Sequence, residues 1–116
     1  MKVNTTRKKW IAIGIIDSKE NNRVITYLDD SPNILCYHDN GEVEEGKKGA
    51  IKKEGCGISE GDVVKVKTDM KMGTIAWEVN GVEQVVHKTK KLKDKTIKWV
   101  PYVELYYSGD CVEFLS

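Results

Sequence analysis

The most constraining feature of this 116-residue chain is the run from Gly61 to Gly81, GDVVKVKTDMKMGTIAWEVNG. Apolar and polar residues alternate over residues 62–68 and again over 74–79, which is the period of two typical of half-buried β-strands. Gly73 ends the short connection between them, where a positive φ angle is needed. Asn80-Gly81 predicts a type I′ hairpin turn, because both central residues of that turn have positive φ. The run therefore predicts an antiparallel meander.

The alternation also assigns faces to the side chains. Ile75, Trp77 and Val79 share one face of their strand, so we expect all three to point into a core. Trp77 is thus predicted to be a core anchor and not a ligand contact.

Short strand-like segments recur along the whole chain, separated by Gly, Asn, Asp and Ser turns. No window sustains helical periodicity, and the glycines within residues 42–54 indicate a loop there. Strands at such short intervals predict an all-β fold, a β-sandwich of two antiparallel sheets. The predicted strands cover residues 10–16, 23–28, 33–38, 62–68, 74–79, 82–88, 99–107 and 111–115.

The segment 10–16 is apolar on both faces. Its odd-numbered isoleucines share one face, and Trp10, Ala12 and Ile16 share the other. Such a strand belongs in the middle of a sandwich, covered on both sides. Gly14 within it indicates a close backbone approach or a bulge.

Several blocks, taken together and in order, resemble the SPRY family. The GD-V-(x)-D-(x)-GTI-(x)-NG wording of the Gly61–Gly81 run is similar to the core of that family. The other similar blocks are WIAIGI (Trp10–Ile15), YLDDSPNILCYHDNG (Tyr27–Gly41), GCGIS (Gly55–Ser59), VPYVEL (Val100–Leu105) and DCVEF (Asp110–Phe114).

The resemblance implies a concanavalin-like sandwich over residues 10–116, preceded by a polar tail at residues 1–9. It also implies a non-catalytic adaptor function, in which loops at one edge of the sandwich bind a peptide or a partner surface. SPRY domains carry further strands before the equivalent of Trp10. We therefore expect an incomplete flank beside Trp10–Ile16, filled by self-association, by a strand from elsewhere in the chain or by a partner's strand.

The resemblance also predicts where a partner binds. The family's stretch equivalent to Tyr27–Gly41 and its turn equivalent to Tyr106–Gly109 lie close together and line the peptide-binding surface. In this chain both places carry tyrosine, with aspartates nearby, and tyrosine offers a large contact area at a modest entropic cost. The predicted partner-binding residues are Tyr27, Asp29, Tyr37, Tyr106 and Tyr107. A lectin-like carbohydrate-binding module, which also uses exposed aromatic side chains, is the alternative function.

Composition excludes some classes of partner. The formal net charge is +1, so no general attraction to nucleic acid or acidic membranes is expected. No run approaches the roughly 18 apolar residues of a membrane helix. Cys36, Cys56 and Cys111 are odd in number and widely spaced, which favours a reducing compartment, and we expect a cytoplasmic protein.

The candidates for catalytic or metal chemistry are weak in the sequence. Cys36 and His38 share a face of one predicted strand, but structural zinc sites use about four ligands and no second pair is nearby. The glutamates of Glu42–Glu45 lie among glycines and lysines, which indicates a solvated turn and not the carboxylate pair of a hydrolase. We therefore expect no enzyme activity, no cofactor and no metal.

A lysine-rich segment covers residues 88–98. Lysines there offer a contact for an acidic partner or a phosphate backbone. The segment has no interleaved tyrosine or phenylalanine to stack on bases. We interpret it as an exposed hairpin loop whose charge keeps it soluble and guards against edge-to-edge pairing.

Overall fold

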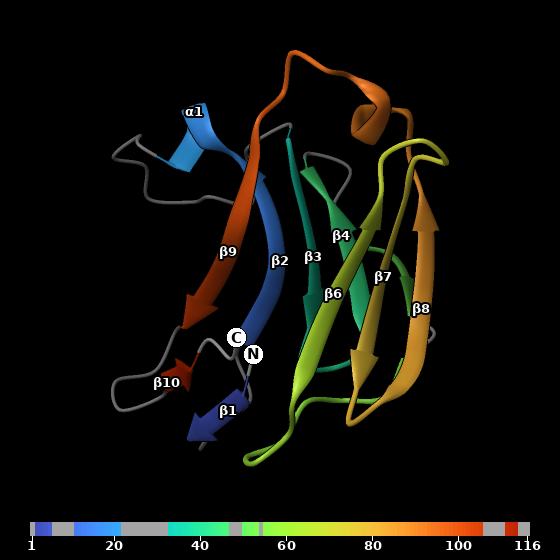
Figure 1. The fold of residues 1–116 in the computed structure, drawn as a ribbon. Coiled ribbons are helices and arrows are strands. Elements are labelled where there is room, and N and C mark those ends of the chain that lie inside the picture. Colours follow the sequence, from blue (N-terminus) through green and yellow to red (C-terminus); the bar gives the residue numbers. More distant parts are fainter. Residues whose placement is uncertain are drawn as a thin grey trace.

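The strands of this chain form two antiparallel sheets that face each other, so the fold is an all-β sandwich (Figure 1). The computed structural model describes residues 2–5, 11–21, 33–46, 50–53, 55–105 and 111–113. One sheet has the strand order β5-β4-β3-β2-β9 and the other β6-β7-β8, while β1 pairs with β10 in a separate ribbon. The elements are β1 (Lys2–Thr5), β2 (Ile11–Asp17), α1 (Ser18–Asn21), β3 (Ile34–His38), β4 (Glu42–Glu45), β5 (Ala50–Lys53), β6 (Val64–Asp69), β7 (Thr74–Val79), β8 (Val82–Lys88), the 3-10 helix η3 (Lys90–Lys93), β9 (Trp99–Leu105) and β10 (Cys111–Glu113).

The predicted meander forms the three-stranded sheet. Strands β7 and β8 span the expected residues, and β6 begins two residues later than expected. Gly73 has φ +70°, and Asn80 and Gly81 have φ 53° and 83°. Both turns therefore use the positive φ angles that the sequence predicted.

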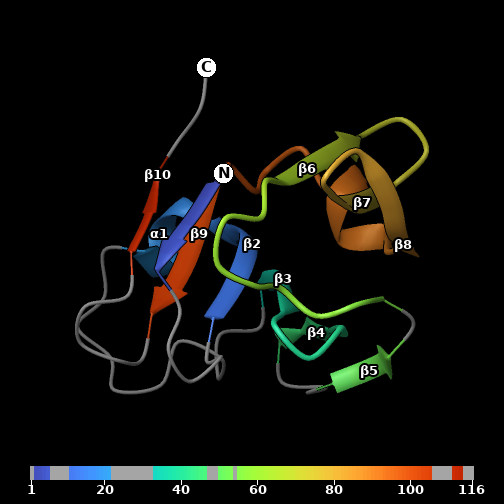
Figure 2. The same cartoon turned by 90° about the horizontal axis from the view of Figure 1, so that it is seen from below.

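The main core lies between the two sheets. Figure 2 shows the five-stranded sheet as an arc from β9 to β5, with the sheet of β6–β8 on one side of this arc. Trp77 is 0% exposed and its ring stacks on Tyr37, with the ring centroids 6.0 Å apart. Its indole Nε1 donates a hydrogen bond of 2.9 Å to the carbonyl oxygen of Ile13 in the opposite sheet. The prediction that Trp77 is a core anchor is confirmed.

Strand β2 is buried on both faces, as its sequence predicted. Its odd-numbered isoleucines face the main core, and Ala12 and Ile16 join a second cluster on the outer face of the same sheet. Gly14 lies against β3 so closely that a Cβ atom there would sit 1.9 Å from the carbonyl oxygen of Leu35. This confirms the expected close backbone approach.

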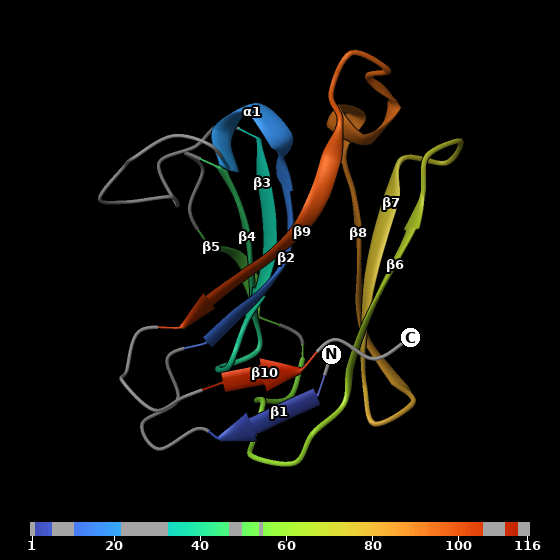
Figure 3. The same cartoon turned by 60° about the vertical axis from the view of Figure 1, so that its left-hand side comes forward.

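The flank of β2 is filled by a strand from elsewhere in the chain, which is one of the three expected arrangements. Strand β9 pairs with β2 along its whole length, from Ile11 opposite Leu105 to Asp17 opposite Trp99, while β3 occupies the other side. The chain thus supplies the neighbouring strand itself. The prediction of a polar tail is wrong for residues 2–5, because these residues form β1, which pairs with β10 (Figure 3).

The expected loop at residues 42–54 is wrong as well, since strands β4 and β5 form there. The alternation of Val43 and Glu45 toward the core with Glu42 and Glu44 away from it is a strand pattern. It escapes a hydrophobicity-based prediction because three of the four residues of β4 are glutamates. The expected strand 23–28 lies outside the described residues, as do residues 106, 107, 114 and 115 of the last two strands.

The lysine-rich segment is not a hairpin loop. It leads from β8 in the three-stranded sheet to β9 in the five-stranded sheet and contains η3. Leu92 within η3 is 3% exposed and joins the main core. The Thr89 hydroxyl caps η3 by accepting a hydrogen bond from the backbone N–H of Lys91. This buried leucine and the cap fix the surrounding lysines at one end of the sandwich.

Candidate functional site

Of the predicted partner-binding residues, only Tyr37 belongs to the described part of the chain, and its assignment is wrong. Its side chain is 0% exposed, because Tyr37 shares the core face of β3 with Leu35. The hydroxyl donates to the carbonyl oxygen of Cys56. Burial, assisted by Cys56, raises the pKa of Tyr37 to about 12. Tyr37 therefore joins the Gly55–Ile58 segment to the core.

The other predicted contacts remain predictions. Tyr27, Asp29, Tyr106 and Tyr107 lie outside the described residues.

Two segments meet at one end of the sandwich and form a candidate binding surface (Figure 1). The β6–β7 turn lies against the start of the β8–β9 crossover, where the N–H of Thr89 donates to the carbonyl oxygen of Gly73 over 2.9 Å. Lys93 packs along Gly73, since a Cβ atom at Gly73 would lie 3.1 Å from its Cε. We call this surface the basic end; its exposed lysines and methionines are Met70, Lys71, Met72, Lys88, Lys90, Lys93, Lys95 and Lys98, and its exposed aspartates are Asp69 and Asp94.

The basic end concentrates positive charge on a nearly neutral chain. This surface has six exposed lysines and two aspartates, Asp69 and Asp94, so its formal charge is +4. The whole chain carries a formal charge of +1. Both carboxylates hold turns: Asp69 accepts from the N–H groups of Lys71 and Met72, and Asp94 accepts from the N–H and hydroxyl of Thr96. The hydrogen bonds from Thr96 lower the pKa of Asp94.

The tip of the same surface is apolar. Met70 and Met72 are 44% and 57% exposed, on a turn between charged residues. Methionine is flexible and polarisable, and it adapts to varied apolar partners at binding surfaces. The basic end therefore offers both long-range attraction for negative charge and a local apolar contact.

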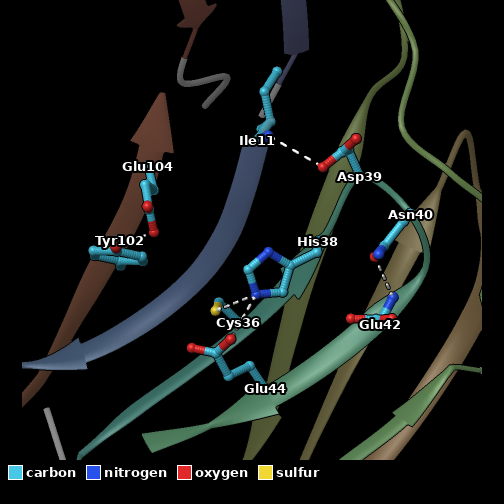
Figure 4. Close-up of polar contacts among 9 residues, drawn as sticks. All are labelled: Ile11, Cys36, His38, Asp39, Asn40, Glu42, Glu44, Tyr102 and Glu104. Atoms are coloured by element: carbon cyan, nitrogen blue, oxygen red, sulfur yellow. Dashed lines mark hydrogen bonds and ion pairs between the residues drawn. The ribbon is translucent and has the colours of Figure 1, made fainter. Parts of the chain in front are cut away.

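A second group of polar side chains lies on the outer face of the five-stranded sheet (Figure 4). Cys36 and His38 point the same way from β3, as predicted, and β4 places Glu44 opposite Cys36. His38 Nε2 lies 3.7 Å from Cys36 Sγ and 3.1 Å from Glu44 Oε2. Across β2, the buried Tyr102 donates its hydroxyl to Glu104 over 2.8 Å.

The sequence interpretation missed Glu44 because it assigned these residues to a loop. The signal was present: a hairpin centred on Asn40, with residues 39–41 as its loop, brings Glu44 across from Cys36. Gly41 has φ +89° at that turn. Recognising this register would have added a third polar residue to the Cys36–His38 pair.

Cys36, His38 and Glu44 do not have the geometry of a cysteine–histidine catalytic triad. In a triad the nucleophile and the acid contact different ring nitrogens of the histidine. One nitrogen then accepts the proton of the nucleophile, while the acid orients the ring through the other nitrogen. Here the thiol and the carboxylate both approach Nε2. Cys36 is also only 1% exposed, which denies a substrate access to the sulfur. The arrangement brings three potential ligand atoms together instead.

A third polar group lies inside the sandwich and ties the two sheets together. Glu45 is 3% exposed, and its carboxylate contacts His87 Nε2 at 2.7 Å, the Thr89 hydroxyl at 3.3 Å and Lys91 Nζ at 3.5 Å. The prediction of a solvated acidic turn is therefore wrong for Glu45. Because Glu44 and Glu45 project to opposite faces of β4, they also form no carboxylate pair.

Comparisons with protein-family models, with curated proteins and with solved structures find no match to this chain. In the part of the chain that the structure describes, no helix is long and apolar enough to cross a membrane.

Proposed function

We propose that this chain is a non-catalytic protein-interaction module of the SPRY type that binds an acidic segment of a partner protein. The observation that carries the proposal is the basic end, where six exposed lysines surround the exposed Met70 and Met72. The sandwich beneath it is held by a buried core and by the network around Glu45. A rigid frame reduces the entropic cost of presenting such a surface.

The chemistry of the surface favours a protein over a nucleic acid. Its cations are all lysines, which act as point charges and lack the bidentate fork with which arginine grips phosphate. No tyrosine, phenylalanine or tryptophan is among its side chains to stack on bases. The methionines match apolar side chains, which a peptide has and a phosphate backbone lacks. The expected ligand is thus an extended segment rich in Asp and Glu with one or two large apolar residues.

The test begins with peptide display against the immobilised chain. We expect selected peptides to be acidic and to contain Leu, Ile, Met or Phe. One selected peptide, labelled with a fluorophore, is then titrated with the chain at low and high salt. Binding should weaken strongly as the screening length falls from about 10 Å at 0.1 M to about 3 Å at 1 M salt.

Charge reversal separates the basic end from net charge. The variant Lys90→Glu/Lys95→Glu reverses two exposed lysines of the basic end, and Lys65→Glu/Lys67→Glu makes the same change on the outer face of β6. We expect the first variant to lose at least tenfold in affinity, mainly through slower association. The second should bind much as the parent does. Equal effects of both variants, or none, would contradict the proposal.

The same experiment distinguishes the alternative function. Glycan-array binding by the parent, lost on substitution of Tyr106 or Tyr107 and untouched by Lys90→Glu/Lys95→Glu, would favour a carbohydrate-binding module. The tyrosine loops remain a proposed second contact region for a protein partner.

A further inference from the structure

We propose that Cys36, His38 and Glu44 bind a divalent transition-metal ion, with Zn²⁺ as the ion that fits best. The three residues offer a thiolate sulfur, an imidazole nitrogen and a carboxylate oxygen, which are the three ligand types of zinc proteins. Their ligand atoms all lie within 4.8 Å of one another. The inference is independent of the acidic partner proposed for the basic end.

Two of the three separations between the ligand atoms are close to those around one ion. With Zn–S of about 2.3 Å and Zn–N and Zn–O of about 2.1 Å, tetrahedral angles place sulfur and nitrogen about 3.6 Å apart, and nitrogen and oxygen about 3.4 Å apart. The structure has 3.7 Å between Cys36 Sγ and His38 Nε2, and 3.1 Å between His38 Nε2 and Glu44 Oε2. The third pair, the Cys36 sulfur and a Glu44 oxygen, lies within 4.8 Å, and the ion would draw these two atoms to about 3.6 Å of each other.

The two contacts at His38 Nε2 also favour a cation over a set of hydrogen bonds. A neutral imidazole nitrogen carries either one proton or one lone pair, so it serves one of its two neighbours well and the other poorly. Cys36 Sγ lies 3.7 Å and Glu44 Oε2 3.1 Å from this one nitrogen, so both compete for it. A bound cation would accept a lone pair from the sulfur, the nitrogen and the oxygen at once.

The surroundings suit a partly open site. Cys36 is 1% exposed, whereas the side chains of Glu44 and His38 are 13% and 24% exposed. The ligands come from two paired strands, β3 and β4, whose register holds them in place before an ion arrives. Three protein ligands with access from solvent leave the fourth position to water or to a ligand donated by another molecule.

The network around Glu45 provides an internal contrast. There His87 and a glutamate also meet, at 2.7 Å, but Lys91 Nζ stands 3.5 Å from the same carboxylate and already supplies a positive charge. No thiol takes part among the described contacts of that group. Metal binding is therefore expected at Cys36–His38–Glu44 and not at Glu45–His87.

The test is a titration of the reduced chain with Zn²⁺ in competition with a zinc-binding dye, followed by Co²⁺ substitution. We expect one tight ion per chain and a rise in the thermal midpoint on Zn²⁺ addition. The Co²⁺ form should show a thiolate-to-cobalt charge-transfer band and intense visible bands of tetrahedral coordination. Absence of stoichiometric binding, or binding that gives no thiolate band, would overturn the proposal.

Matched variants locate the ion. His38→Gln and Glu44→Gln should each weaken Zn²⁺ binding at least about 10–100-fold, the loss found even for residues that only support a ligand. Cys36→Ser should abolish the thiolate band. Glu42→Gln changes a carboxylate on the same face of β4, and Cys56→Ser removes an exposed thiol, so both should bind like the parent.

The readouts remain decisive even if Cys36→Ser, in a buried position, fails to fold. His38 is the most exposed of the three side chains, so His38→Gln should keep the parent's far-ultraviolet circular dichroism. A folded His38→Gln that binds Zn²⁺ as tightly as the parent would refute the site. So would a thiolate band that disappears in Cys56→Ser.

Discussion

Replacing Trp77 with alanine tests the packing of the two sheets most directly. Trp77 is 0% exposed, stacks on Tyr37 and donates a hydrogen bond to the Ile13 carbonyl oxygen across the core. No other contact in the described structure combines an aromatic stack with a buried hydrogen bond between the sheets. Trp77→Ala removes both and leaves a cavity.

The magnitude follows from burial. A buried tryptophan removes roughly 200 Å² from water, worth about 5 kcal/mol at 25 cal/mol per Å², and the alanine retains a minor part of it. The lost hydrogen bond adds about 1 kcal/mol, and partial collapse of the cavity recovers some of the loss. The expected decrease in the free energy of unfolding is about 3–5 kcal/mol. The free energy of unfolding of a small domain is only about 5–15 kcal/mol, so the variant should be marginally stable.

Urea unfolding followed by circular dichroism measures this change. Val86→Ala is the control, because Val86 lies on the outer face of the same sheet and is 46% exposed; it should change stability by less than about 1 kcal/mol. Trp77→Phe keeps an aromatic ring but loses the N–H donor, so it should fall between the parent and Trp77→Ala. A loss below about 1 kcal/mol for Trp77→Ala would refute the assignment of Trp77 as the main link between the sheets.

Three further predictions concern single positions. The pKa of Tyr37 is raised from 10.0 to about 12 in the folded chain, so the unfolded chain loses the hydroxyl proton at a lower pH. The free energy of unfolding should therefore be constant below pH 10 and fall between pH 10 and 12. The urea midpoint should show this fall, and Tyr37→Phe should lessen it. Gly14→Ala should destabilise by about 2 kcal/mol or more, since its Cβ would meet the Leu35 carbonyl oxygen at 1.9 Å; a thermal midpoint within a degree of the parent's would count against the close approach. Gly81→Val should cost about 1–2 kcal/mol, because φ is +83° with open space around the residue; Gly81→Asn, which tolerates that φ better, should recover part of the loss in the same melt.

The local patterns predicted the three-stranded sheet well. Ile75, Trp77 and Val79 face the core as their alternation required. The Asn80-Gly81 pair forms the turn that its positive φ angles favour. These features depend on residues close together in the chain, so a single segment carries all the information.

The five-stranded sheet shows where such patterns fail. Strand β4 was not predicted because three of its four residues are glutamates. A strand whose polar side chains are paired within the fold lacks the alternation of apolar and polar residues that indicates a strand. Glu45 is buried because His87 of β8 and Thr89 and Lys91 of the crossover contact its carboxylate. Because strand β4 was not predicted, Glu44 was not recognised as a neighbour of Cys36 and His38, and the third ligand of the proposed metal site was missed.

The sequence by itself determined the all-β class, the turns of the meander and the inward faces of β2 and β7. The tertiary structure decided that β9 covers the flank of β2, that Tyr37 is buried and that the lysine-rich crossover meets the β6–β7 turn. It also decided that Glu44 meets Cys36 and His38. The physical reason is range: period and turn propensity act within a few residues, whereas strand order and register depend on which distant segments together bury the most apolar surface.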